Sequence, residues 1–126
     1  MLAALFDGLF TVRQGFKWGM IYGPLDCKKA GITMQTSSDL LPISMGMMKP
    51  YYDYFAATAP DGTFGDPPAT MRTHAAALED VLAGFETLGA RDEVPRLFVE
   101  MPHRGIAEGL DDKALKAVID VLAGDC

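Results

Sequence analysis

The first 23 residues contain no cluster of turn-forming residues, and this constrains the fold more than any other feature of the sequence. Their apolar residues follow the spacing of an α-helix and do not alternate as in a β-strand. They are Leu2, Leu5, Phe6, Leu9, Phe10, Val12, Phe16 and Met20. No Ser, Thr, Asp or Asn precedes Leu2. We therefore predict a long helix over residues 2–23 that begins without a capping side chain. Pro24 should bend or interrupt it.

Four further helices are predicted downstream. The second helix is predicted to start at Ser37, Ser38 and Asp39 and to reach about residue 57. Pro50 predicts a kink in it near residues 47–48. The turn-rich stretch at residues 59–68 predicts a loop. A third helix should run over residues 69–88 and stop at Gly89, because its apolar positions recur at helical intervals.

Asp92 opens the fourth helix, which should continue to about residue 108 with a kink at Pro102. Asp111 is expected to cap the fifth, which Gly124 ends. Its predicted inner face consists of Leu115, Val118, Ile119 and Leu122. No segment alternates with enrichment in β-branched residues. The sequence therefore predicts an all-α fold, a helical bundle of about five helices with a long N-terminal helix.

Composition narrows the class of protein. The 126 residues suffice for one domain, and their net charge of -6 argues against nucleic acid as a partner. No apolar run is long enough to cross a membrane, and no early positive region suggests a signal peptide, so we expect a cytoplasmic protein. Cys27 and Cys126 suggest two free thiols. Because 49% of the residues are hydrophobic, some apolar surface should face a partner.

Two stripes run along the predicted first helix. Its four glycines, Gly8, Gly15, Gly19 and Gly23, share one narrow face, and we expect close packing against another helix to offset their cost in helix stability. A second, polar and aromatic stripe contains Asp7, Thr11, Gln14, Trp18 and Tyr22. Thr11 and Gln14 suit a solvated face, whereas Trp18 and Tyr22 are less usual in water and suggest a functional surface.

His74 lies on the apolar stripe of the third helix and should point inward. Two interpretations stay open, a core histidine with a satisfied hydrogen bond or a residue of a binding site. His103 suits a surface position. The sequence contains no metal-ligand cluster, no glycine-rich phosphate loop and no catalytic-triad motif. Metal, nucleotide-phosphate and triad chemistry therefore have no support in its motifs.

Several segments together resemble a known family. They are ALFDGLF at residues 4–10, AGI and SDLLP near the second helix, DGTF before the loop, MRTHAAALEDVL on the third helix and RGIAEGLDDKALKAVIDVL at the end. On these segments the chain resembles the helical C-terminal half of NADPH-dependent imine reductases and reductive aminases. These enzymes are relatives of 3-hydroxyisobutyrate dehydrogenase and 6-phosphogluconate dehydrogenase. The resemblance covers nearly the whole chain.

The resemblance implies an architecture and a function. In the family an N-terminal Rossmann domain binds NADPH, a long helix links the domains, and two chains interlock so that each active site lies between subunits. Residues 1–126 would then form the substrate-binding and dimerisation domain of a homodimer that acts on a small imine, or on a carbonyl compound and an amine. The Rossmann domain is expected to be absent from this chain. Alone, the chain should be inactive.

Site residues follow from the same resemblance. Asp7 matches an acidic residue suited to protonate or orient an imine nitrogen, and Thr73 and His74 match substrate-pocket positions. Met47 falls near a pocket-lining position, and Trp18 joins the substrate-binding set from the aromatic stripe. Many relatives carry a Tyr or Asp proton donor two turns beyond Asp7, where this sequence has Gly15. Either Asp7 or Tyr22 replaces that donor, or the protein departs from imine reduction.

Two alternatives stay open. A 3-hydroxy-acid dehydrogenase would need a lysine followed four residues later by an asparagine. Here Lys17 is followed by Ile21, and the chain contains no asparagine, so this is the weaker enzymatic interpretation. The other alternative is a helical dimerisation module that has lost its chemistry.

Overall fold

The computed structural model describes residues 1–58 and 67–124, and within these ranges helices joined by short connections are the regular elements. Its elements are α1 (Leu2–Lys29), α2 (Met34–Asp39), α3 (Leu41–Gly46), α4 (Met48–Thr58), α5 (Met71–Thr87), α6 (Glu93–Ala107), the 3₁₀ turn η1 (Leu115–Ala117) and α7 (Val118–Ala123). No strand forms among the described residues, and the one isolated β-bridge there joins Thr70 to Ala114. The predicted all-α fold is confirmed.

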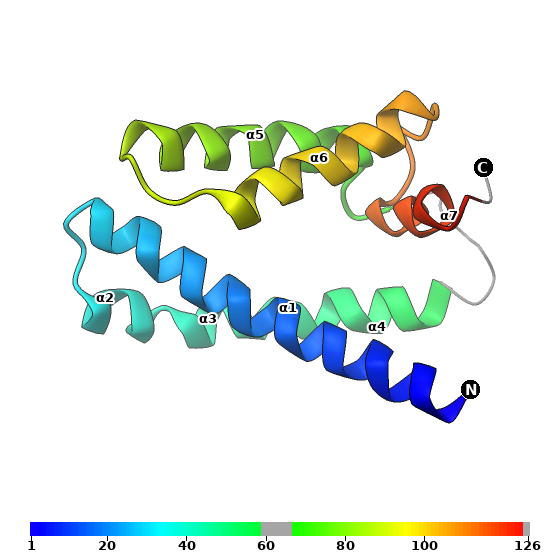
Figure 1. Ribbon diagram of the computed structural model, residues 1–126, viewed down its shortest axis with the longest axis horizontal. Coiled ribbons are helices and arrows are strands. Elements are labelled where there is room, and N and C mark those ends of the chain that lie inside the picture. The colour runs from blue at the N-terminus through cyan, green and yellow to red at the C-terminus, as the bar shows by residue number, and fades with distance from the viewer. Residues whose placement is uncertain (59–66, 125–126) are drawn as a thin grey trace.

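Helix α1 crosses the molecule diagonally and carries the N-terminus away from α5 and α6 (Figure 1). It has 28 residues, a length of about 42 Å at 1.5 Å per residue. No side chain caps its start at Met1, as the sequence predicts. Pro24 lies inside the helix and does not end it. The chain leaves α1 through Gly31, whose φ of +86° is readily available only to glycine.

The predicted second helix is wrong in its start and in its continuity. Ser37, Ser38 and Asp39 lie within α2, and the capping side chain is Thr33, whose hydroxyl accepts a hydrogen bond from the Thr36 amide at 3.1 Å. Two interruptions then separate α2, α3 and α4. The second, at Met47, falls where a kink was predicted. Pro42 and Pro50 each lie in the first turn of a new helix, where a missing N–H costs nothing, and so they mark starts.

Helices α5 and α6 lie side by side as an antiparallel hairpin (Figure 1). Thr70 caps α5 by accepting a hydrogen bond from the Thr73 amide at 3.2 Å. Gly89 has a φ of +65° and ends the helix, as predicted. Asp92 precedes α6, but its carboxylate binds Arg96 at 2.7 Å and does not cap the helix. Pro102 is accommodated within α6.

The C-terminal segment differs from the prediction. Asp111 caps no helix, because its carboxylate pairs with Arg72 at 2.5 Å, and Asp112 binds the same guanidinium at 2.8 Å. Helix formation begins only at η1. Consequently the predicted inner face is wrong in part: Val118 is buried, whereas Ile119 and Leu122 are more than half exposed. Gly124 ends α7 in the left-handed conformation.

The core lies where α5, α6 and the C-terminal segment meet. Met71, Ala117 and Val118 form its buried centre, and four partly buried side chains, Met101, Ile106, Leu110 and Leu115, pack against it. Ser37 is the one buried residue among residues 1–58; every other buried residue lies beyond residue 70. Helices α1 to α4 therefore contribute little to the core of a single chain.

Two expectations fall outside the described residues. The predicted loop at residues 59–68 is described only at Pro67 and Pro68, and Cys126 lies beyond residue 124. Cys27 is a free thiol, as expected. Among the described helices, none is long and apolar enough to cross a membrane.

Candidate functional site: an apolar groove beside the long helix

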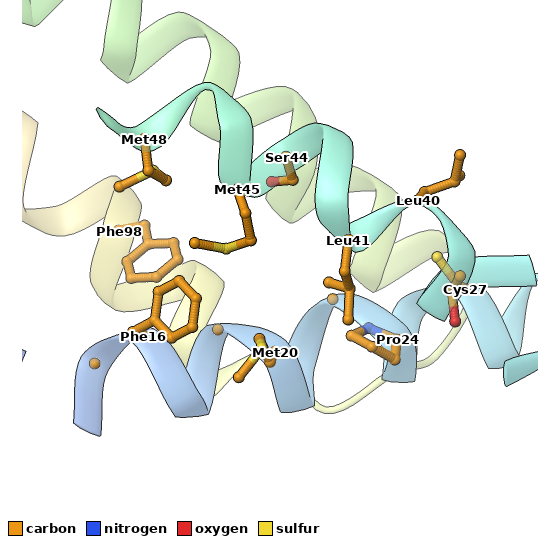
Figure 2. Close-up of a pocket in the computed structure, with 14 residues that line it drawn as sticks. Phe16, Met20, Pro24, Cys27, Leu40, Leu41, Ser44, Met45, Met48 and Phe98 are labelled. Carbon is orange, nitrogen blue, oxygen red and sulfur yellow. The ribbon is translucent and has the colours of Figure 1, made fainter. Parts of the chain in front are cut away.

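An apolar groove of about 610 Å³ is lined by α1 on one side and by residues of α2, α3 and α4 on the other (Figure 2). Phe16 and Met20 project into it from α1, Met45 and Met48 project from the facing helices, and Phe98 of α6 closes one end. The other lining residues are Gly15, Gly19, Gly23, Pro24, Cys27, Ser37, Leu40, Leu41 and Ser44. Almost all of these surfaces are apolar. The groove therefore suits an apolar side chain or helix far better than a charged ligand.

The glycine stripe of α1 faces this groove. A Cβ atom built at Gly15, Gly19 or Gly23 would meet no atom within 4 Å, and the same holds at Gly8. Close packing of these glycines against another helix was predicted, and within this chain the prediction is wrong. The space that the glycines leave is part of the open groove.

The N-terminal half of α1 presents a continuous apolar surface. Leu2, Leu5, Phe6, Leu9 and Phe10 each expose more than half of their surface, and α1 contains no buried residue at all. Exposed apolar surface on this scale usually marks an interaction site.

His74 lines a second, smaller cavity of about 120 Å³, together with Tyr51 and Tyr54 of α4 and Pro67. Its side chain is half-buried, as the stripe on the third helix predicts. Burial lowers the pKa of His74, so the imidazole is neutral at pH 7. Burial also raises the pKa of Tyr51. The hydroxyl of Tyr54 is buried and has no hydrogen-bond partner among the described residues. The neighbouring Thr73 is exposed.

Lys116, in η1 of the C-terminal segment, contacts α4 next to this cavity. No pattern in the sequence predicted this contact. Its ammonium group donates a hydrogen bond to the Thr58 hydroxyl and lies 4.7 Å from the centre of the Tyr54 ring. The side chain is buried. In the α-helix predicted from the sequence, Lys116 would lie on the outer face of that helix. The 3₁₀ turn η1 has fewer residues per turn and changes the direction in which residues 115–117 point. No periodicity in the sequence marks that change.

Tyr22 binds α6. Its hydroxyl donates a hydrogen bond to Glu93 Oε2 at 2.9 Å, and Glu93 Oε1 in turn accepts one from Arg91 Nε at 2.6 Å. Bonding to Arg91, aided by the Tyr22 hydroxyl, lowers the pKa of Glu93 to about 2. The bond to Glu93 raises the pKa of Tyr22.

Besides Thr73, three more predicted site residues lie on the surface. Asp7 is exposed on the N-terminal half of α1, where the Thr11 hydroxyl donates a hydrogen bond to its main-chain carbonyl at 2.7 Å. Trp18 is 51% exposed and Met47 72% exposed. None of the six predicted site residues lines the groove, and His74 alone lines the smaller cavity. A single chain does not bring the six together. The described residues contain no cluster of side chains suited to a metal ion.

Comparison with known proteins places these features in a family. A family model described as NADPH-dependent reductive aminase-like, C-terminal domain, matches residues 19–124. The chain belongs to this family and corresponds to its C-terminal domain. No curated protein matches the sequence.

Solved structures share the fold. An imine reductase from a Pseudomonas species has 18% sequence identity and a TM-score of 0.84, with 94% of this chain and 41% of that chain covered. The Myxococcus stipitatus imine reductase in complex with NADP⁺ has 13% sequence identity and a TM-score of 0.87, with 94% of this chain and 44% of that chain covered. The Aspergillus terreus reductive aminase in complex with NADPH and ethyl levulinate has 21% sequence identity and a TM-score of 0.80, with 94% of this chain and 40% of that chain covered. The chain thus spans about two fifths of the length of these enzymes.

Proposed function

We propose that residues 1–126 act as one substrate-binding and dimerisation domain of an imine reductase-like or reductive aminase-like oxidoreductase. The observation that carries this proposal is the family match over residues 19–124, together with a fold shared with imine reductases over 94% of the chain. The substrate would be a small imine, or a carbonyl compound and an amine. We place the protein in the cytoplasm on the composition of the sequence.

The working assembly is a symmetric homodimer. The apolar groove beside α1 and the exposed apolar surface of α1 are complementary in chemistry, so the helix of one chain can occupy the groove of another. Burying Leu2, Phe6 and Phe10 would contribute roughly 1.5–3 kcal/mol each. In a two-fold symmetric dimer, the apolar surface of α1 in each chain would pack into the groove of the other chain, so that both surfaces are buried in both chains.

NADPH is proposed as the cofactor of the whole enzyme. The described residues do not fit a dinucleotide, because such sites require a strand, a glycine-rich turn and a helix, and these residues form helices only. A Rossmann domain, in the same protein or as a separate chain, would therefore bind the cofactor. We predict no imine reduction by residues 1–126 alone.

Asp7 is proposed as the group that protonates or orients the imine nitrogen, and Tyr22 as the second candidate donor. The two lie fifteen residues apart on α1, about 22 Å along its axis, so they cannot serve one nitrogen from the same chain. The hydroxyl of Tyr22 already donates to Glu93, which favours Asp7. Trp18, Met47, Thr73 and His74 are proposed to contact the substrate within the dimer.

Reconstitution tests this function. A separately expressed Rossmann domain from a related imine reductase is added to the chain, and oxidation of NADPH is followed with a cyclic imine. We expect turnover only in the mixture. Asp7→Asn should lower kcat by about 10²-fold or more, whereas Tyr22→Phe should act less strongly. Asp53→Asn, in a surface pair with Lys49, is the matched control. Turnover that survives Asp7→Asn would remove Asp7 from this role.

One observation favours a second candidate, a dimerisation module without chemistry. Gly15 occupies the position where many relatives carry a proton donor. If the chain forms dimers but the mixture never oxidises NADPH, this alternative stands. Oxidation of a 3-hydroxy acid with reduction of NADP⁺ to NADPH would instead support the dehydrogenase alternative, for which Lys17 would be the base.

A further inference from the structure

The attachment of α1 to the rest of the molecule is concentrated near its C-terminal end. All of residues 1–13 are exposed, and α1 packs against α2 and α6. Among the described residues, the hydrogen bond from Tyr22 to Glu93 is the only side-chain hydrogen bond that joins α1 to another helix. Residues 1–13 of α1 therefore project from a support that lies further along the helix, where Phe16 lies beside Phe98 of α6 (Figure 2) and residues 22 and 24–27 are half-buried.

The helix is weakest at this same place. Pro24 has no N–H, so the carbonyl of Met20 lacks its usual partner within the helix. Gly19 and Gly23, on either side of Tyr22, each lower helix stability by about 1 kcal/mol relative to alanine. Bends in helices commonly arise at such positions. A contact at Tyr22 can therefore decide the direction of everything upstream.

We infer that Glu93, supported by Arg91, is a positioning residue that sets the direction of the projecting half of α1 and hence the location of Asp7. The inference rests on the proposed role of Asp7. Tyr22 transmits the effect, since its ring is part of α1 and its hydroxyl is held by Glu93 of α6. Arg91 fixes the Glu93 carboxylate by binding its other oxygen.

The geometry makes the effect large. Asp7 lies about 22 Å upstream of Tyr22, so a tilt of about 10° at Tyr22 displaces Asp7 by about 4 Å. A displacement of about 1 Å in a catalytic group can cost 10²-fold in rate. The surface bond itself contributes little to stability. Loss of the Tyr22–Glu93 bond should thus alter catalysis far more than folding.

A distance measurement tests the direction of α1 without any activity. Spin labels are placed at Leu5→Cys on α1 and Val81→Cys on α5, with Cys27 and Cys126 replaced by serine, and the labelled chain is diluted with unlabelled chain. We expect Tyr22→Phe and Glu93→Ala to shift or broaden the distance distribution by several ångströms. Glu100→Ala is the matched control, because Glu100 of α6 pairs only with Arg104 among the described residues. An unchanged distribution in both variants would overturn the inference.

Kinetics in the reconstituted enzyme provide the second readout. Tyr22→Phe and Glu93→Ala should each lower kcat by about 10-fold with KM changed less than about 2-fold, and the double variant should fall no further than either one. Full kcat despite a redirected α1 would also overturn the inference. If even the unmodified mixture is inactive, the proposed function has failed, and the spin-label distances still decide whether Glu93 directs α1. Circular dichroism confirms that each variant is folded.

Discussion

Met71 and Gly105 are in such close contact that a Cβ atom at position 105 would lie 2.8 Å from the Met71 methyl carbon. Met71 begins α5 and is fully buried, while Gly105 belongs to the last turns of α6. The glycine thus leaves room for the Met71 side chain at the centre of the core. In the other described glycines, a built Cβ meets nothing within 4 Å.

This contact predicts that Gly105→Ala destabilises the protein. Replacing a helical glycine by alanine gains about 1 kcal/mol, but overpacking a buried site costs typically 1–3 kcal/mol. Because Met71 is fully buried and its Sδ and Cγ also lie within 3.3 Å of the added Cβ, we expect a net loss of about 1 kcal/mol in urea unfolding. Gly84→Ala in α5 is the matched control, and it should stabilise the chain because its Cβ has space. Equal effects of the two substitutions would contradict this account.

The Glu93 carboxylate predicts acid sensitivity. Its pKa in the folded chain is about 2, below the ordinary 4.5, so the unfolded chain binds more protons between these values. The stabilisation, which is small because the pair is exposed to solvent, is present above pH 4.5 and is lost as the pH falls toward 2. The thermal midpoint, followed by circular dichroism across this range, should fall less steeply in Glu93→Gln. Glu100→Gln should keep the slope of the unmodified chain.

His74 predicts a second pH effect at higher pH. Its pKa is lowered by burial, so the unfolded chain takes up a proton first as the pH falls below 6.5. Stability is full above 6.5 and declines as the pH drops through the pKa of the folded state. The imidazole carbon-bound protons of His74 should titrate below 6.5 in an NMR experiment. In His74→Gln this part of the pH dependence should disappear; if it persists, another group is responsible.

The open groove predicts a dimer that a single bulky side chain can block. Gly19→Trp adds volume where the chain itself has no atom within 4 Å, so a folded monomer should remain. The unmodified chain should have the mass of a dimer by light scattering at micromolar concentration. Gly84→Trp adds the same bulk on α5, away from the groove, and should leave the mass unchanged. A monomeric unmodified chain would refute the dimer.

Local sequence patterns predicted the long first helix and several helix ends correctly, but they did not predict the division of the second helix or the roles of several side chains. The long uncapped α1 and the stops at Gly89 and Gly124 follow from local rules of spacing and glycine conformation, which a sequence displays directly. The predicted capping role of Asp111 was wrong because its carboxylate accepts a hydrogen bond from Arg72, which lies 39 residues earlier in the chain. The burial of Lys116 depends on the 3₁₀ turn and on α4, and neither is visible in periodicity.

The candidate site was the least accessible to prediction. The glycine stripe was correctly located on α1, but what it faces depends on how α3 and α4 divide at Met47, which no local pattern determines. The bond between Tyr22 and Glu93 spans 71 residues and had no signal in spacing. Whether Asp7, Trp18, Met47, Thr73 and His74 meet one substrate stays a prediction.

The bridge between Thr70 and Ala114 closes the second half of the chain on itself. The Met71 amide donates to the Lys113 carbonyl at 2.8 Å beside it, and Arg72 binds Asp111 and Asp112. Residues 70–118 therefore form a tied unit that contains nearly every buried side chain. We expect its amide hydrogens to exchange slowly with solvent, whereas those of α1 to α4 exchange through low-energy local opening. Residues 70–118 would then be stable on their own, whereas α1 to α4 would be stabilised when α1 of a second chain fills the groove.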